Sequence, residues 1–573
     1  MTQIADKVYK NAKVYSVALD GKEIHANALA IKDGKFTYVG NEEGVKAWIG
    51  ESTEVIDCKG KSVIPGLVDA HLHIATSATK FGSCDLGSIV PDPDTDTPEK
   101  VIKKIQEKLK EFAESHKDDP VIHGLGWDRS WFSGAIKGIV RPFTRHDIDA
   151  VISDKPVVLT SFCGHVVMLN TKALEIANVT SDTDSQNGLI VKEADGSPSG
   201  YIQEPAVYGP IVHRIPNFEF TPKQHHDYMA KAFGMFASKG YTLLCDCQQN
   251  TTAYEVLSEM AKNGEFPARV SGVHNINDET RKEDLEKAIK NRTRFDYEDL
   301  FTVDTVKYFA DGTFAMLEPY KEGALKTLGK EAGTREPLLW NEEHMEESMA
   351  EANKEGFNIH THAMGSYAVR RVIDCYENAQ KKYPSSKIRN IIAHCTYVSQ
   401  QDRVRMGANH IIASTQPGWF SDHPAMEPVQ VLAWGEDTVR QAYPNKSLMD
   451  NGVVCAYGSD FAVNIPYGLA GIQVAMTRRC VKTDLTYAQF KDLPAALPEE
   501  CIGLKQALQA HTINAAYQAH LENTTGSIEV GKSAELIVLD SDIETIPTQQ
   551  IQDIKILETV FKGKTVFKAL YMR

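Results

Sequence analysis

The sequence lacks the features of a membrane protein, a secreted protein or a nucleic-acid-binding protein. Its 573 residues contain no run of about 18 apolar residues, the length that spans a bilayer. The first residues, MTQIADKVYKNAKVYSV, lack the apolar segment of a signal peptide. Lysine and arginine number 62 against 77 aspartates and glutamates, which gives a net charge of -15. Because phosphate contacts need clustered lysine and arginine, we expect no nucleic-acid partner. The missing apolar segments lead us to expect no membrane partner and a cytoplasmic location.

A disulfide framework is also missing. The 10 cysteines are scattered along the chain without a regular spacing, which is typical of a protein from a reducing compartment. The one close pair, Cys245 and Cys247, follows the apolar stretch 241–244. This pair could supply half of a metal site, but two buried thiols on one strand face are the favoured interpretation.

Both ends of the chain have the sequence pattern of short β-strands joined by turns. Residues 1–64 read as short strands with a hairpin turn at Asp33-Gly34, and residues 527–573 read as strands with a turn at Lys562-Gly563-Lys564. A chain of this length is too long for one simple core, so two or more domains are expected. We predict a small β-sandwich domain formed by both termini, with residues 65–526 threaded between them.

The long middle segment alternates between strand and helix patterns. The candidate strands are 63–74, 241–247, 268–275, 302–312, 357–362, 389–395, 410–416 and 453–460. Eight strands separated by helices predict an α/β fold, a (β/α)8 TIM-like barrel over residues 65–526. Residues 80–221 then form a large insertion after the first strand, an expected lid or substrate subdomain.

Histidines and an aspartate stand at the ends of several of these strands. His71 and His73 are two residues apart, so both imidazoles point to the same face of a strand. In a (β/α)8 barrel the reactive side chains lie at the carboxyl ends of the strands. The set at such ends is His71, His73, His362, His394 and Asp460, with Lys307 inside the fourth strand. A single strand-end histidine is more often a packed or hydrogen-bonded residue, but the joint set favours a metal site.

The same residues lie in motifs that resemble those of a known family. The motifs are PGLVDAHLH, VKYFADGT, HTHAMGSYA, IIAHC, STQP, YGSDFAV and GSIEVGKSAELIVLD, with weaker matches in GLGWD, GHVVMLNTKAL and GYIQE. In this order they resemble the amidohydrolase superfamily of metal-dependent hydrolases. Within it, they are similar to the YtcJ-like branch that includes N-substituted formamide deformylases. The resemblance covers nearly the whole chain and is almost silent about the substrate.

The resemblance implies a role for each of these residues. His71 and His73 match metal ligands of the first strand, and Lys307 matches a lysine that can be carboxylated and bridge two metal ions. The other implied ligands are His362, His394 and Asp460. The chain departs from the branch at Ser366, where aspartate is common, which puts a role for that carboxylate in doubt. It also departs at Glu535, where aspartate is usual, and we expect little functional effect there.

The chemistry of these groups favours a zinc hydrolase. Imidazoles, a carboxylate and a lysine carbamate suit Zn2+, one ion or two, although other divalent metals are compatible with the set. A bound zinc ion lowers the pKa of water from 15.7 to about 7 and polarises a carbonyl. We therefore predict hydrolysis of an amide-like C–N bond, in a linear or cyclic amide or an N-substituted formamide. Asp460 is the expected catalytic base, a role typically worth about 10²–10⁴-fold in rate, and His394 or a residue of the insertion is expected to stabilise the oxyanion.

Other positions keep alternatives open. Lys307 is either a carbamate in a binuclear centre or a plain structural or substrate-pairing lysine beside one metal ion. His360 shares the strand face of His362 and is expected to support the ligands or compete with His362. Candidate substrate contacts in the insertion are His165 and Trp127, for which ordinary packing is the alternative. Gln416 and Arg478 are further candidates for the pocket.

Two other functions are compatible with the same sequence. One is a metal-dependent isomerase or decarboxylase that uses the same site, and the other is a non-catalytic regulatory protein that keeps the fold. The intact set of candidate ligands counts against the second. A homodimer is expected only because large soluble enzymes are commonly dimers.

Overall fold

The computed structural model describes residues 4–569 except 93–94, 134–135, 163, 165, 185–188, 313–337, 428–429, 432–433 and 485–486. By its internal contacts the chain divides into two compact units, one of Met1–Thr76 with Ala232–Arg573 and one of Ser77–Lys231. The insertion expected at 80–221 falls within the second unit. Among the residues described, no helix is both long and apolar enough to cross a membrane.

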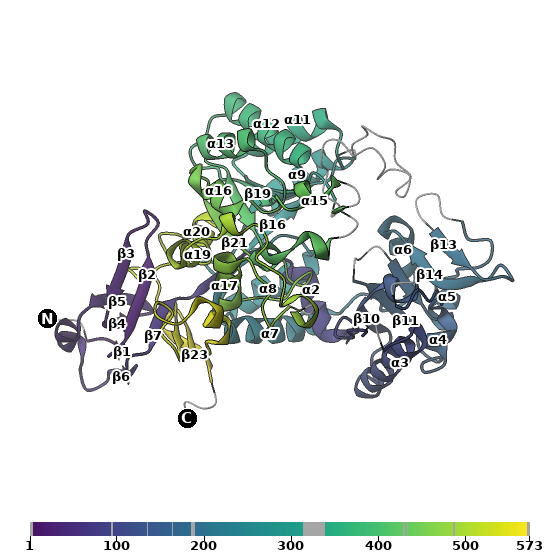
Figure 1. The fold of residues 1–573 in the computed structure, drawn as a ribbon, viewed down its shortest axis with the longest axis horizontal. Coiled ribbons are helices and arrows are strands. Elements are labelled where there is room, and N and C mark those ends of the chain that lie inside the picture. The colour runs from purple at the N-terminus through teal and green to yellow at the C-terminus, as the bar shows by residue number, and fades with distance from the viewer. Residues whose placement is uncertain are drawn as a thin grey trace. The chain divides into compact units, whose positions relative to one another are not determined.

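An eight-stranded parallel sheet forms the centre of the first unit (Figure 1). In sheet order its strands are β21 (Cys455–Tyr457), β20 (Ile412–Thr415), β19 (Asn390–His394), β18 (Asn358–Ala363), β17 (Phe301–Phe309), β16 (Arg269–Asn275), β15 (Tyr241–Asp246) and β8 (Leu67–Leu72). Each coincides with one of the eight strands expected from the sequence, so the prediction of a (β/α)8 barrel is confirmed.

The two outer strands of this sheet, β8 and β21, meet just beyond the end of β21. The backbone N–H of Asp460 donates to the carbonyl of His71 at 2.7 Å, and that of His73 donates to the carbonyl of Phe461 at 2.7 Å. Gly458 is required here, because a Cβ at this position would lie 2.4 Å from the backbone nitrogen of His71. The barrel therefore closes at the point where the histidine pair faces Asp460.

Helices connect the strands along the outside of the barrel. They include α7 (Pro222–Ser238), α8 (Thr251–Lys262), α9 (Arg281–Asn291), α11 (Glu342–Lys354), α12 (Ser366–Lys382), α13 (Gln400–Ala408), α16 (Asn445–Asp450), α17 (Leu469–Thr477), α19 (Leu504–Ala510) and α20 (Ile513–Gln518). In α12, Val369, Val372, Ile373 and Tyr376 are buried. Their spacing of three and four residues places them on one face of the helix, which explains why this segment packs on the sheet.

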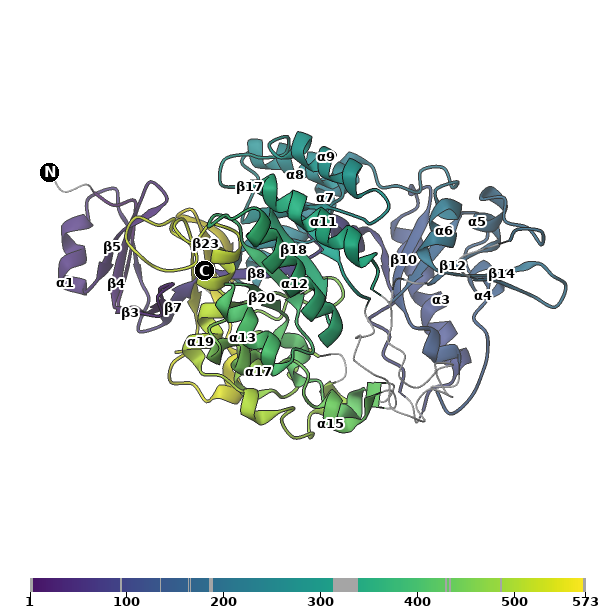
Figure 2. The ribbon, with the colours of Figure 1, turned by 90° about the horizontal axis from the view of Figure 1, so that it is seen from above.

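The termini build two further sheets in the first unit (Figure 2). One has the order β5 (Lys35–Gly40), β4 (Ala28–Lys32), β1 (Lys7–Lys10), β6 (Glu54–Asp57), and the other has the order β24 (Lys564–Lys568), β23 (Ile556–Phe561), β22 (Leu536–Leu539), β7 (Ser62–Pro65), β2 (Lys13–Val17), β3 (Glu23–Ala26). Side chains from both sheets, such as Ile31 and Leu536, share one hydrophobic core. The predicted β-sandwich from both ends of the chain is confirmed.

The passage from this sandwich into the barrel lies at Pro65-Gly66. Pro65 ends β7, and β8 begins at Leu67. A Cβ on Gly66 would lie 2.3 Å from Oγ1 of Thr242, so only glycine allows the chain to pass so close to β15. The glycine of this dipeptide is therefore a steric requirement of the passage from the sandwich into the barrel.

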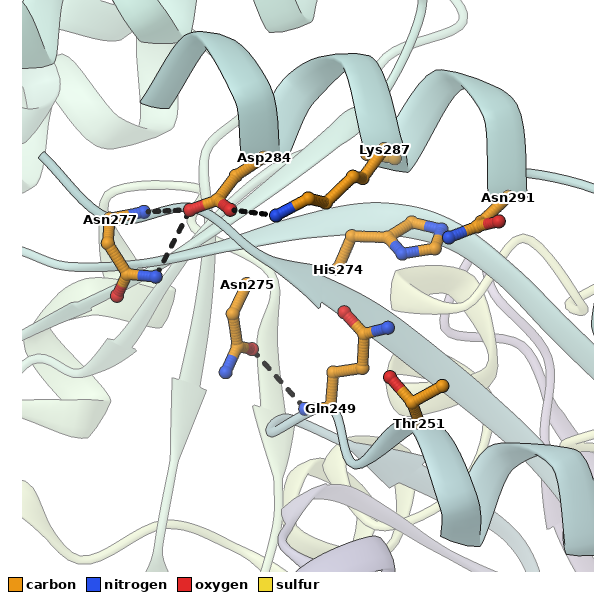
Figure 3. A pocket seen from close by; sticks show the side chains of 9 residues that line it. Gln249, Thr251, His274, Asn275, Asn277, Asp284, Lys287 and Asn291 are labelled. Carbon is orange, nitrogen blue, oxygen red and sulfur yellow. Dashed lines mark hydrogen bonds and ion pairs between the residues drawn. The ribbon is translucent and has the colours of Figure 1, made fainter. Parts of the chain in front are cut away.

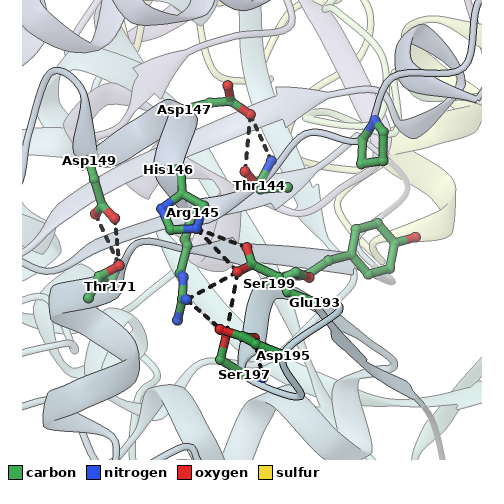
Figure 4. Close-up of polar contacts among 12 residues, drawn as sticks. Thr144, Arg145, His146, Asp147, Asp149, Thr171, Glu193, Asp195, Ser197 and Ser199 are labelled. Carbon is green, nitrogen blue, oxygen red and sulfur yellow. Dashed lines mark hydrogen bonds and ion pairs between the residues drawn. The ribbon is translucent and has the colours of Figure 1, made fainter.

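The second unit has its own sheet and core. The sheet order is β13 (Leu189–Lys192), β14 (Pro198–Gln203), β12 (Val166–Leu169), β11 (Val157–Ser161), β10 (Ile122–Trp127), β9 (Cys84–Asp85). Its helices include α3 (Pro98–Ser115), α4 (Arg145–Asp149), α5 (Thr171–Ile176) and α6 (Pro205–Val212). A polar network holds α4 in place, since both Arg145 and His146 contact Glu193 (Figure 4). Every partner in this network already has a counterpart of opposite charge or a hydrogen bond, which is typical of a structural cluster.

Glu535 has a larger structural role than the sequence led us to expect. Its carboxylate is 2% exposed and accepts hydrogen bonds from Arg269, at the start of β16, and from Thr525. Arg269 is fully buried, and its other partner is Asp299 at 2.8 Å. A buried guanidinium needs this compensation, so Glu535 joins the terminal β-sheet to the barrel.

We predict that Glu535→Gln lowers the free energy of unfolding by about 3 kcal/mol, because Arg269 keeps only the partly exposed Asp299. Equilibrium urea unfolding measures the loss. The matched control is Glu544→Gln, which removes an exposed carboxylate that contacts His25, and it should change the free energy by less than about 1 kcal/mol. Equal stability of the two variants would contradict the prediction.

Candidate metal centre

His71, His73 and Asp460 meet at the seam of the barrel. Asp460 Oδ1 lies 2.9 Å from His73 Nε2 and 3.5 Å from His71 Nε2. The three side chains form a group of the size that holds a metal ion. His71 is fully buried, and the other two are nearly so. The histidine pair at the end of the first barrel strand is thus completed by Asp460, which is almost 390 positions away in the sequence.

A second pair of histidines lies beside the first group. The rings of His362 and His394 have centroids 4.4 Å apart, and the ring of His394 lies 5.0 Å from that of His71. His394 Nδ1 is 2.9 Å from Oε1 of Gln416, an acceptor. The proton of His394 is therefore on Nδ1, and Nε2 carries the free lone pair. Gln416, expected to contact substrate, is placed to orient His394.

Lys307 lies buried in the interior of the barrel. It is 0% exposed, and its Nζ makes no hydrogen bond among the described residues. Nζ lies 4.9 Å from the centre of the Phe309 ring. Burial lowers the pKa of Lys307, which favours the neutral amine. A neutral amine is the form that reacts with carbon dioxide to give a carbamate.

Burial keeps His71, His362 and His394 neutral, whereas Asp460 is charged. Burial lowers the pKa of His71 and His362 well below the ordinary value, and lowers that of His394 to about 4. Burial also opposes ionisation of Asp460. The hydrogen bond from His73 outweighs that effect, so the pKa of Asp460 falls to about 2. At neutral pH the site therefore offers imidazole lone pairs and one carboxylate.

Two of these residues have an unusual backbone conformation. His394 has φ of +72° and Asp460 has φ of +58°, in the left-handed region that side chains with a Cβ seldom adopt. Such conformations cost on the order of 1–3 kcal/mol each and collect at functional sites. Here the hydrogen bond from Asp460 N to His71 O holds one of them in place.

The donor atoms fit a bound metal ion. His71 Nε2, His73 Nδ1 and Lys307 Nζ are buried polar atoms without a hydrogen bond in the described part of the chain. Leaving such atoms unpaired is costly. Neutral imidazoles with a carboxylate are ligands that divalent transition metals prefer. A cation held by His71, His73 and Asp460 would satisfy Nε2 of His71, the unpaired nitrogen that lies 3.5 Å from Asp460 Oδ1.

Comparison with known proteins identifies the family. Residues 54–567 match the sequence model of the amidohydrolase family. The chain belongs to the amidohydrolase family. It is 25% identical over 580 residues to the putative amidohydrolase YtcJ of Bacillus subtilis, which covers 98% of this chain and 99% of that protein. It is 22% identical over 584 residues to the N-substituted formamide deformylase of Arthrobacter pascens, with 98% of each chain covered.

A solved structure shares the fold of this amidohydrolase. The crystal structure of an uncharacterized metal-dependent hydrolase from Pyrococcus horikoshii superposes with a TM-score of 0.72 at 22% identity, over 95% of this chain and 99% of that one. The predicted family, fold and enzyme class are confirmed. This chain is a hydrolase that acts on carbon–nitrogen bonds.

Two residues beside the centre were given little weight in the sequence. Cys247 and His360 form a second group with His71 that has the spacing of metal ligands. Sulfur of Cys247 lies 3.8 Å from Nδ1 of His360, whose Nε2 lies 3.1 Å from Nδ1 of His71. Both cysteines of the close pair are buried, as expected, but Cys247 also faces the histidines. The available signal was its place at the end of the second barrel strand.

Asp311 is another residue that sequence reasoning passed over. It is 1% exposed and accepts hydrogen bonds from the backbone N–H groups of Met364, at 3.0 Å, and Gly365, at 2.8 Å. These groups stand at the start of α12, where Ser366 is the first residue. Asp311 Oδ1 also lies 3.4 Å from Nε2 of His362. Burial raises the pKa of Asp311 to about 7, against these hydrogen bonds.

Trp127 and Arg478, two further candidate contacts, are buried and donate hydrogen bonds to backbone carbonyls. Trp127 lies in the core of the second unit, is 0% exposed and donates from Nε1 to the carbonyl of Leu159 at 3.0 Å. That geometry matches the packing alternative. Arg478 is also buried, and its guanidinium donates to backbone carbonyls, including that of Tyr443 at 3.0 Å. His165 lies outside the described residues.

A polar cavity of about 270 Å³ lies near the carboxyl ends of β15 and β16 (Figure 3). Its lining is rich in carboxamides, namely Gln249, Asn275, Asn277 and Asn291, and also contains His274 and Asp284. None of the candidate ligands lines it. Asn275 pairs in register with Lys307, so the cavity lies at the same end of the barrel as the metal centre.

We predict that Asp311→Asn lowers the free energy of unfolding by about 1–3 kcal/mol, because an amide NH2 group would face a backbone N–H donor. The measurement is the shift of the midpoint of equilibrium unfolding of the metal-free protein. Asp118→Asn, which changes an exposed carboxylate, serves as the control and should stay within about 0.5 kcal/mol of the parent. An Asp311 variant as stable as this control would refute the capping role.

Proposed function

We propose that this amidohydrolase hydrolyses an amide-like C–N bond of a small molecule at a zinc centre. The observation that carries the proposal is the convergence of neutral imidazoles and one ionised carboxylate at the closed seam of the barrel, with a buried lysine that has no hydrogen bond to any described residue. His71, His73 and Asp460 would hold one ion, and Lys307, His362 and His394 a second. When bound, zinc supplies an activated water at neutral pH and polarises the substrate carbonyl.

The protein's own contribution to the reaction is proton transfer and orientation. Asp460 is ionised at neutral pH, so it can accept the proton of the attacking water and pass it to the leaving amine. His394 donates its only ring proton to Gln416, so it has none left for an oxyanion. We therefore assign His394 to metal binding alone, in contrast to the oxyanion role considered from the sequence.

The substrate proposal rests on the relatives. One relative is named as an N-substituted formamide deformylase and covers 98% of the chain, which supports a small amide or formamide. An isomerase or decarboxylase that uses the same groups would give a product without added water. Product mass separates these reactions, since hydrolysis adds one water molecule.

Location and assembly are also proposals. The nine cysteines described, all those of the chain except Cys163, are free, which supports a reducing compartment such as the cytoplasm. A homodimer is proposed on the frequency of two-fold assemblies among enzymes alone.

We predict that chelation of metal abolishes hydrolysis of a panel of N-substituted amides and that zinc restores it. Asp460→Asn should lower kcat by about 10²–10⁴-fold, because the amide cannot carry a proton. The exposed Asp437 provides the control, and Asp437→Asn should leave kcat unchanged. Hydrolysis that persists in metal-free enzyme, or unchanged kcat in the Asp460 variant, would rule out the proposed mechanism.

We predict that Lys307 carries a carbamate in the metal-loaded enzyme. Native mass spectrometry should show a mass increase equal to one carbon dioxide, which is absent in Lys307→Ala. Loss of carbon dioxide from the buffer should lower the metal content from two ions toward one, and bicarbonate should restore it. A fully loaded binuclear enzyme with an unmodified lysine would contradict this assignment.

A further inference from the structure

A line of hydrogen-bonding groups leads from His71 away from Asp460. His71 Nδ1 lies 3.1 Å from His360 Nε2, and the sulfur of Cys247 lies 3.8 Å from Nδ1 and 3.9 Å from Nε2 of His360. The sulfur lies 3.4 Å from the carbonyl oxygen of Cys245. His71, His360 and Cys247 are each at most 2% exposed, so water does not compete for these contacts.

The nitrogen of His71 that faces Asp460 fixes the proton between His71 and His360. Nε2 of His71 lies 3.5 Å from Asp460 Oδ1, so it is the nitrogen that a metal ion beside Asp460 would use. That nitrogen then keeps its lone pair, and the ring proton is on Nδ1, which donates to Nε2 of His360. The sulfur of Cys247 lies almost equally far from both ring nitrogens of His360, so it packs against this ring without selecting a tautomer.

We propose that His360 and Cys247 are positioning residues that fix the tautomer and the ring orientation of His71 for metal binding. This role rests on the proposed metal centre. A histidine that binds metal usually donates its other N–H to an acceptor that orients it, and loss of that acceptor typically costs about 10–100-fold in metal affinity. Here the acceptor is a neutral imidazole, and the sulfur of Cys247 packs against its ring.

The same three residues allow a different arrangement that the experiment must separate. Their donor atoms lie within 4.8 Å of one another, so a metal ion could bind directly to the sulfur of Cys247. In that arrangement Cys247 would lose its proton, and His71 would use Nδ1 as a ligand. The two arrangements differ in one observable, which is a metal–sulfur bond.

The test compares metal binding by the full-length enzyme and four variants, His360→Ala, His360→Gln, Cys247→Ser and His274→Ala. Zinc affinity is measured by competition with a chelator, and the cobalt-loaded forms are examined by absorption spectroscopy. His360→Ala should bind zinc about 10–100-fold more weakly. His360→Gln should recover most of that loss, because its amide oxygen accepts from His71. Cys247→Ser should stay close to the parent, since a hydroxyl can both donate and accept.

His274→Ala is the matched control, because it removes a buried imidazole from strand β16 whose ring packs on Phe357. It should bind zinc as the parent does. A sulfur-to-cobalt charge-transfer band that disappears in Cys247→Ser would overturn the positioning role in favour of a direct ligand. Equal zinc affinity in all variants would overturn it as well. A parent enzyme that binds no zinc would instead overturn the proposed metal centre, and the positioning role with it.

Discussion

The closure of the barrel between β8 and the segment after β21 is the constraint on which the rest of the site depends. Two backbone hydrogen bonds join these segments, and Gly458 permits the close approach. This closure sets Asp460 against His71 and His73, at the cost of a left-handed conformation at Asp460. The negative charge of Asp460 stabilises positive charge in an interior that would otherwise exclude it. The proposed metal ion would be that positive charge.

Most of the ligand set follows from local sequence rules. His71 and His73 lie on one strand face by simple alternation, and the end of a barrel strand is where such residues act. His394 and Asp460 were expected at strand ends for the same reason. Since all eight strands lie where apolar runs bounded by turns predicted them, the approach of these side chains follows from the closed geometry of a barrel.

Contacts that depend on register or on loop paths were not accessible in this way. Gln416 and Arg478 were both expected in the substrate pocket, yet one orients His394 and the other holds backbone carbonyls. Asp311 caps α12 across more than 50 residues of sequence, and nothing in its local motif predicts that partner. Glu535 was expected to have little functional effect, and its structural role as a counterion of the buried Arg269 was not predicted. In each case the partner lies far away in sequence, so local pattern carries no information about it.

The supports of the metal ligands differ from one another in a way that bears on their strength as ligands. His394 donates to a neutral amide, and His71 donates to a neutral imidazole, whereas His362 lies beside the carboxylate of Asp311. A carboxylate acceptor raises the basicity of a bound imidazole more than a neutral acceptor does. Burial raises the pKa of Asp311 to about 7, so this carboxyl group is only partly ionised at neutral pH, which weakens that effect at this position as well. The proposed centre would therefore combine imidazole ligands of modest basicity with one ionised carboxylate, Asp460. Because such imidazoles donate little charge, a bound ion would keep more of its capacity to polarise a substrate carbonyl.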